Sequence, residues 1–201
     1  MRYDKDRKAR SRRLIVEAAA KRIRKNGIST TSVVTFMADA KLTHGGFYSH
    51  FRSKDALVQE ALIESFQEMR ARLAEAASHG GVDMIVRSYL QPVHRDRTEQ
   101  GCPVVALAGE IHRQSGRIRS AFRRELDQHL QLIQDHLPAE MDAGQRKKMA
   151  TSVFSIMVGT LQLARAVNDT TMSDAILENG AAAALSVIAA QSHPAGKAPF
   201  N

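Results

Sequence analysis

Residues 42–55 read LTHGGFYSHFRSKD. In this stretch a pair of glycines, at 45–46, stands directly before Phe47 and Tyr48, with Phe51 close behind. A glycine inside a helix costs about 1 kcal/mol against alanine, so two in a row need a compensating reason. The neighbouring sequence supplies one.

The chain has the pattern of an all-α protein. Its apolar residues recur at helical spacing almost throughout, and no segment alternates as a strand does. About nine helices are expected in its 201 residues, a length sufficient for a hydrophobic core and one or two domains. We expect them near residues 8–25, from Thr30 or Thr31, at 44–50, 54–78, 82–95, 103–113, 116–136, 143–168 and 171–190.

Local signals mark the ends of the first four helices. Asn26 and Gly27 are typical of a helix C-terminus, and Thr43 and Ser53 are typical N-caps. The first helix is expected to bury Leu14, Ile15, Ala18, Ala19 and Ile23. The long fourth helix carries an apolar stripe made of Leu57, Ala61, Leu62, Phe66, Met69 and Leu73.

Positive charge is concentrated at the front of the chain. Residues 1–55 contain 14 Lys and Arg against 5 Asp and Glu, whereas the other 146 residues contain 15 against 16. Localised positive charge is the electrostatic signature of a polyanion-binding module. A solvated basic arm is the plainer alternative, and for residues 2–13 the two interpretations stay open.

Three short helices with a tight turn between the second and third predict a helix-turn-helix, whose last helix enters the major groove of DNA. In this arrangement the two glycines allow the backbone to approach DNA closely. Phe47 is expected to pack inward, while Tyr48 and His50 present polar tips to phosphates. The N-terminus of the fourth helix, at Lys54, is suited to a phosphate.

At this point residues 7–67 resemble the DNA-binding domain of the TetR family of bacterial transcriptional regulators. The resemblance rests on a shared pattern of residues, which consists of Gly27, Thr30, Thr31, Met37, Ala38, Ala40, Leu42, Thr43, Gly45, Phe47, Tyr48, Phe51, Lys54, Asp55 and Leu57. Lys41 departs from it, because the family often has glycine there. Two interpretations stay open: a left-handed backbone at a cost for lysine, or an added cation near DNA.

The resemblance implies roles for individual residues. Thr31 and Ser32 would contact the DNA backbone. The bases would be faced by Thr43, His44, Gly45 and Gly46, and phosphates would be held by Tyr48, His50 and Lys54. The implied protein is a ligand-responsive regulator, most often a repressor, that binds a palindromic operator as a homodimer, with neither a cofactor nor a bound metal.

The resemblance also implies that residues 68–191 form a ligand-binding and dimerisation domain. The segment 150–165 is apolar nearly all round, and the last helix is rich in small residues, so the last two helices are expected to form the dimer interface. Residues 192–201 are expected to be a mobile tail. An unknown small-molecule effector would bind among residues such as Tyr89, His112, Phe154, Met157 and Leu161, each of which also fits a plain core.

The single cysteine, Cys102, precedes a predicted helix whose dipole could lower a thiol pKa. It is a candidate sensor of oxidants or electrophiles, and a small buried residue is the more ordinary interpretation. One cysteine also excludes an intrachain disulfide, which fits the cytoplasm. The charged first residues resemble neither a signal peptide nor a membrane span.

Two other classes of protein fit the sequence less well. HGG occurs at 44–46 and 79–81, as in some esterases, yet the chain has no G-x-S-x-G elbow and its histidines are scattered. An enzyme is therefore not expected. An architectural DNA-binding protein would spread its positive charge over a larger surface than this chain does.

Overall fold

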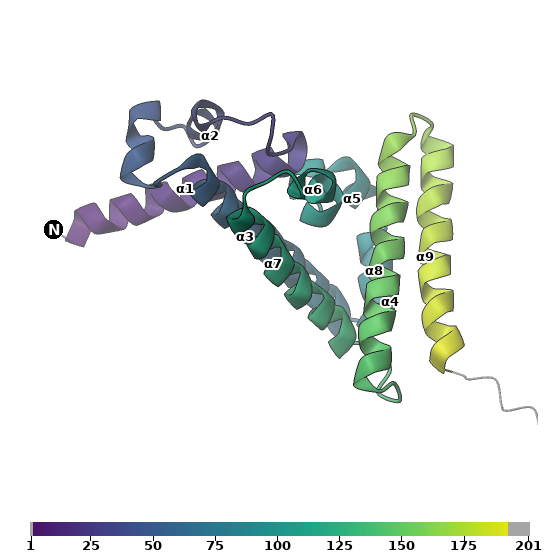
Figure 1. Cartoon of the computed structure of the whole chain (residues 1–201). Helices are drawn as coiled ribbons and strands as arrows, with labels where there is room; N and C mark the ends of the chain where they lie inside the picture. Colours follow the sequence, from purple (N-terminus) through teal and green to yellow (C-terminus); the bar gives the residue numbers. More distant parts are fainter. Residues whose placement is uncertain (1, 193–201) are drawn as a thin grey trace, which may run out of the picture. The chain divides into compact units, whose positions relative to one another are not determined.

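The computed structural model describes residues 2–192, with side chains described for residues 6–190, and it places none of residues 2–192 in a strand (Figure 1). Nine α-helices and two short 3-10 helices make up this part of the chain. Their bounds are α1 Arg2–Asn26, α2 Val33–Asp39, η1 His44–Ser49, α3 Lys54–Ser78, α4 Gly81–Tyr89, α5 Pro92–Asp96, η2 Thr98–Gln100, α6 Pro103–Ile111, α7 Gly116–Asp135, α8 Ala143–Ala166 and α9 Thr170–Ser192.

The first helix begins earlier than the sequence predicted, at Arg2, so the whole of the basic segment at 2–13 is helical. It ends as predicted, because Gly27 adopts a φ of +81° and donates its amide to the carbonyl of Ile23. Ile15, Ala19 and Ile23 are buried as expected, but Leu14 is 40% exposed. The prediction that Leu14 is buried was wrong, because helical spacing identifies the apolar side of a helix but not how far around the helix the buried face extends.

The cap of α2 is Ser32 rather than Thr30 or Thr31. The Ser32 hydroxyl accepts a hydrogen bond from the amide of Thr35 at 3.2 Å, and the Thr35 side chain accepts one from the Ser32 amide. The two threonines are engaged elsewhere, since their hydroxyls donate to the carbonyls of Asn26 and Ile28 respectively. Thr30, Thr31 and Ser32 are all residue types that cap helices, so the sequence alone did not determine at which of them the helix begins.

Lys41 lies in the turn between α2 and η1 with a φ of +57°, and it is the one non-glycine residue of the described chain with a positive φ. The left-handed turn expected from the missing glycine is therefore present. Two hydrogen bonds close the turn: the Lys41 amide donates to the carbonyl of Ala38, and the Leu42 amide donates to the carbonyl of Met37.

The long helix α3 confirms its prediction. The Ser53 hydroxyl accepts from the amide of Ala56 at 3.1 Å, and every residue of the predicted apolar stripe is buried. The helix predicted over 82–95 is instead broken between Tyr89 and Pro92 into α4 and α5. Pro92 is the physical reason. Proline has no backbone N–H to donate a hydrogen bond inside a helix, and it disfavours the helical conformation of the residue before it.

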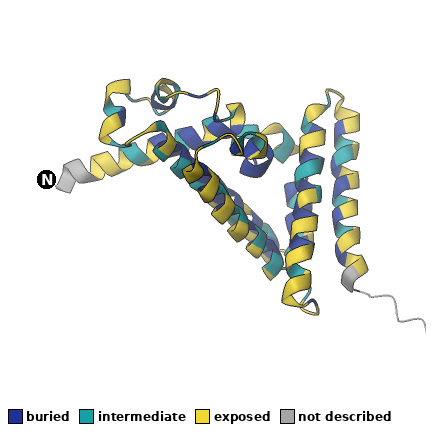
Figure 2. Cartoon of the chain, viewed as in Figure 1, coloured by how far each residue is buried: buried dark blue, intermediate teal, exposed yellow. Residues whose placement is uncertain are grey.

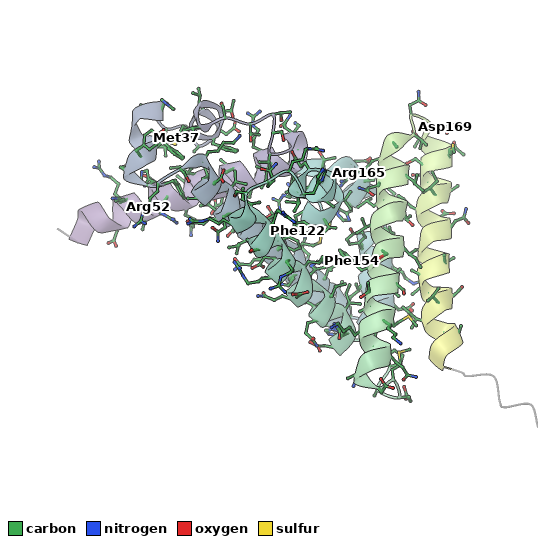
Figure 3. The ribbon with its side chains drawn as sticks, in the orientation of Figure 1. Met37, Arg52, Phe122, Phe154, Arg165 and Asp169 are labelled. Atoms are coloured by element: carbon green, nitrogen blue, oxygen red, sulfur yellow. The ribbon has the colours of Figure 1, made fainter. Side chains whose placement is uncertain are left out.

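The described chain divides into two compact units. One comprises residues 2–71 and 96–128, and the other comprises residues 72–95 and 129–192. This division differs from the boundary at 67/68 expected from the sequence. Residues 96–128 pack with the N-terminal helices, as seen in the contact of Phe66 with Phe122 at 5.6 Å and the ion pair of Arg70 with Glu125 at 2.8 Å (Phe122 is labelled in Figure 3).

In the second unit α8 and α9 lie side by side and antiparallel (Figure 1). Both carry buried residues along one side and exposed residues along the other (Figure 2). The helices approach closely at Gly180, where a Cβ atom would overlap the side chain of Thr160. Helix α9 ends at Ser192, and the remainder of the predicted tail lies outside the described residues.

Candidate nucleic-acid interface

Helix η1 is anchored by aromatic packing beneath it. Phe47 is completely buried, stacks on Phe51 with ring centroids 5.7 Å apart, and meets the edge of Tyr48 at 5.2 Å. Phe36 and Met37 of α2 are buried as well. One aromatic side chain therefore holds the short helix in place, as predicted, and the residues around it are turned outward.

The outward residues are those at the start of η1. Thr43, His44 and Gly45 are exposed, and the Tyr48 side chain is 72% exposed. None of these positions is covered by another part of the first unit. The beginning of η1 is thus presented to solvent, which is where a recognition helix carries its base-contacting residues.

The glycines of η1, Gly45 and Gly46, have no role within the chain that the structure explains. Neither has a positive φ. A Cβ atom at Gly45 would meet nothing within 4 Å, and one at Gly46 would make ordinary contacts of 3.8 Å with Met37 and Thr43. Backbone conformation and internal packing would both permit alanine at these sites, so neither accounts for the glycines.

Basic side chains of α1 stand beside this surface. The guanidinium of Arg12 lies 4.5 Å from the ring centroid of Phe51 and is paired with Glu60 of α3. The pKa of His50 is lowered by partial burial and by the positive charges of Lys8 and Arg12. The surroundings of His50 therefore favour its neutral form.

Three residues with predicted DNA contacts also have partners in the chain. The ammonium of Lys54 donates to the carbonyl oxygens of Ile28 at 3.2 Å and Thr31 at 2.5 Å. Thr31 is buried, and its hydroxyl bonds to Ile28. Ser32 is exposed and caps α2. Of these three, Ser32 is the one placed on the surface, while Lys54 and Thr31 fix the turn before α2.

The candidate effector residues fall into two groups. Tyr89, Phe154, Met157 and Leu161 are buried in the second unit, where Phe154 lies 6.2 Å from Tyr89 and 4.8 Å from His129, ring to ring (Phe154 is labelled in Figure 3). His112 is exposed and belongs to the first unit. The structure therefore gathers four of the five into one interior.

Sequence reasoning missed His94 and His129 in that interior. His94 lies edge-on to Tyr89 at 4.5 Å and bonds through Nδ1 to the Tyr89 carbonyl at 2.7 Å. The signal was weak, since a lone histidine near an apolar stretch is common on protein surfaces. Cys102, the sensor candidate, is completely buried at the N-cap of α6.

A three-helix unit with an exposed, glycine-containing third helix and a basic first helix defines a DNA-binding protein of the helix-turn-helix class. Comparison with known families identifies which one. Residues 15–61 match the model described as bacterial regulatory proteins, tetR family, and residues 80–179 match the model described as tetracyclin repressor-like, C-terminal domain. The chain belongs to the TetR family of transcriptional regulators.

Characterised relatives carry names of the same kind. The chain is 23% identical over 147 residues to the HTH-type transcriptional repressor DhaR of a Mycobacterium species, covering 72% of this chain and 74% of that protein. It is 35% identical over 77 residues to the HTH-type transcriptional regulator TtgR of Pseudomonas putida, covering 38% of this chain and 36% of that protein.

Solved structures share the fold. The reduced form of NemR from E. coli superposes with a TM-score of 0.72 at 20% identity, covering 88% of this chain and 96% of NemR. A TetR regulator from Chloroflexus aurantiacus gives 0.71 at 23% identity, covering 92% and 96%. Among the described residues, no helix has the length and apolar character needed to span a membrane.

Proposed function

We propose that the protein is a homodimeric repressor that binds a palindromic DNA operator through η1 and releases it when a small molecule binds the second unit. The observation that carries the proposal is the free space at Gly45. A position where alanine would fit the chain, but where glycine stands at the exposed start of η1, is accounted for by close approach of a base or phosphate.

In this proposal Thr43, His44, Gly45 and Gly46 face base edges, which specify sequence. Tyr48, His50 and Ser32 contact phosphates. Thr31 in the turn before α2, and Lys54 at the N-terminus of α3, add contacts to the DNA backbone. The N-terminus of a helix favours an anion such as a phosphate. The basic start of α1 adds charge beside them, and binding is expected to weaken as salt rises because phosphate contacts release counterions.

The dimer interface proposed here is the outer face of α8 and α9. Residues 149–164 and 179–192 contain no charged side chain. Three large apolar residues are exposed on these helices, Leu163 at 61%, Met172 at 55% and Val187 at 36%. A face of this kind is typical of a surface that a second copy covers. Sedimentation of the wild type and of Leu163→Glu tests it, since the charged variant should be monomeric.

The effector site proposed here lies in the interior lined by Tyr89, Phe154, Met157 and Leu161. The DhaR relative is named a repressor, which supports the repressor role in this proposal. Cys102 is the alternative sensor. Because its thiol is buried, mild peroxide should leave it unmodified in a mass spectrum, and rapid modification would instead support the sensor hypothesis.

The direct test is selection from a library of random duplexes, followed by sequencing, at two salt concentrations. We expect a palindromic consensus with half-sites about 34 Å apart. Binding without sequence preference would instead favour an architectural protein and contradict the proposal.

The selected duplex then tests Gly45. Gly45→Ala should lose operator affinity by about fivefold or more, because the loss of a base contact costs about 1 kcal/mol or more, and the protein should remain folded. Gly116→Ala is the matched control, since a Cβ there also meets nothing within 4 Å and α7 is not in the proposed interface. Equal affinity for all three proteins would remove the support that Gly45 gives.

A further inference from the structure

The turn between α1 and α2 is held by a carboxylate from far along the chain. Glu110, on α6, accepts hydrogen bonds from the amide of Ile28 at 2.6 Å, the amide of Ser29 at 3.1 Å and the Ser29 hydroxyl at 2.8 Å. Three donors from two adjacent residues thus converge on one acidic side chain.

The carbonyl groups of the same turn are held by a cation. Lys54, at the start of α3, donates to the carbonyls of Ile28 and Thr31. Ser32 follows immediately and caps α2. The amides of the turn therefore donate to a carboxylate, and its carbonyls accept from an ammonium group. Hydrogen bonds to charged groups are stronger than those between neutral groups.

The fit at this place is close. Gly27 has a positive φ, and a Cβ atom built there would lie 2.7 Å from Oε1 of Glu110. The positive φ favours glycine at residue 27, and a Cβ atom there would also displace the carboxylate of Glu110. Helix α6 and the turn lie in the same compact unit, so their contact is part of one packed body.

We propose that Glu110 is a positioning residue for DNA binding. Its carboxylate sets where α2 begins and thereby the orientation of η1, and it makes the DNA-binding helices sensitive to any displacement of α6. This inference rests on the proposed function, because it concerns the regulation of the same DNA-binding surface.

The negative charge of Glu110 allows a positioning role to be distinguished from a general effect of net charge on DNA binding. Removing one negative charge from the protein should by itself strengthen binding to a polyanion. A positioning role predicts the opposite for a specific site, since misplaced recognition residues lose base contacts while general attraction to phosphates persists. Specific and non-specific affinities should therefore move apart.

The test uses the full-length protein and the duplex selected as described above. Glu110→Gln has the size of glutamate but loses the charge and directs an amide group at donors. We expect it to lose about tenfold or more in operator affinity, with non-specific affinity equal to or above that of the wild type. The control is Glu140→Gln, an exposed acid with the same change of charge, which should bind the operator at least as tightly as the wild type does.

Two milder variants guard against misfolding. Ser29→Ala removes one of the three donors and leaves the charge, so a loss of a few-fold is expected. Glu110→Asp retains the charge but shortens the side chain, and it should recover part of the affinity lost in Glu110→Gln. Hydrogen exchange at the amides of Ile28 and Ser29 should accelerate in Glu110→Gln.

The outcomes are distinct. A wild-type protein that selects no sequence overturns the proposed function, and this inference with it. A wild type that selects an operator, together with a Glu110→Gln protein that is folded and binds it equally well, overturns the inference alone. A parallel loss of specific and non-specific binding in Glu110→Gln and Glu110→Asp also overturns it, because that pattern indicates general destabilisation.

Discussion

The turn before α2 and the contact between α8 and α9 hold helices together by opposite means. In the first unit, charged side chains bond to backbone groups, through Glu110, Lys54 and the buried Arg24. In the second unit, α8 and α9 meet through small and apolar residues, and a Cβ atom at Gly180 would overlap the side chain of Thr160. Charge-assisted bonds fix an orientation, whereas close apolar packing fixes a distance. The first suits a turn whose angle positions other residues.

Arg24 provides the largest expected effect in this comparison. Its guanidinium is fully buried, donates to the Glu99 carbonyl at 2.8 Å and pairs with Glu68 at 2.6 Å. Arg24→Met should destabilise the protein by about 3 kcal/mol, because it removes a buried charge-assisted hydrogen bond to the Glu99 carbonyl and leaves the half-buried Glu68 unpaired. The measurement is urea unfolding.

Arg22→Met is the matched control for this prediction. Arg22 pairs with Asp39 near the surface, through two bonds of 2.6 Å. Exposed pairs contribute about 1 kcal/mol or less, so this variant should unfold almost as the wild type does. Equal losses of unfolding free energy in Arg24→Met and Arg22→Met would contradict the view that buried charged groups stabilise the first unit.

His94 should make the second unit sensitive to acid. The pKa of His94 is lowered to about 4, chiefly by burial, with the hydrogen bond to the Tyr89 carbonyl opposing this shift and the charges of Arg165 and Arg72 adding to it. In the unfolded chain the pKa is about 6.5. The stability contribution is therefore complete above pH 6.5 and is lost as the pH falls toward 4, by about 3 kcal/mol in all.

Urea unfolding between about pH 7.5 and 4.5, which spans most of this window, measures the loss. His94→Asn retains a side-chain donor for the Tyr89 carbonyl but does not titrate, so its stability should fall less with acid than that of the wild type. The exposed His79→Asn serves as the control and should follow the wild type. Parallel curves for wild type and His94→Asn would show that His94 is not responsible.

Gly180→Ala tests the apolar contact. The added methyl group overlaps the Thr160 side chain, and overpacking costs about 1–3 kcal/mol. Gly109→Ala is the comparison, because a Cβ in the middle of α6 meets nothing and alanine should stabilise that helix by up to about 1 kcal/mol. Thermal unfolding should therefore shift in opposite directions, and shifts of the same sign would refute close packing at Gly180.

Lys41 has the smallest expected effect. Its left-handed backbone is strained for lysine, so Lys41→Gly should stabilise the protein by at most about 1 kcal/mol, since the glycine also gains freedom in the unfolded chain. Operator affinity should be unchanged. A clear loss of affinity at constant stability would identify Lys41 as a DNA contact.

What the sequence predicts correctly here is what local chemistry determines. Gly27 ends α1, Ser53 caps α3, and Phe47 is buried beneath an exposed turn because each depends on its near neighbours. The long apolar stripe of α3 was equally clear, since 25 residues of helix leave little freedom in choosing a buried face.

Features that depend on distant residues could not be predicted in this way. The bonds between Glu110 and the turn join residues 81 and 82 positions apart, and no local pattern announces them. Lys54 matched a phosphate-binding position in sequence, yet its ammonium also bonds to carbonyls that only the folded turn brings near. The helix predicted over 82–95 ran through Pro92, although proline is a local signal for a break in a helix.

The bonds of Glu110 bear on how regulators of this family can be recombined. A chimera joined after residue 67 would carry the helix-turn-helix of one parent and α6 of the other. It would exchange the recognition surface but leave the α1–α2 turn without the carboxylate to which its amides bond. Transplanting a DNA specificity into or out of this protein therefore requires the acceptor at 110 to be moved together with the glycine at 27 and the serine at 29.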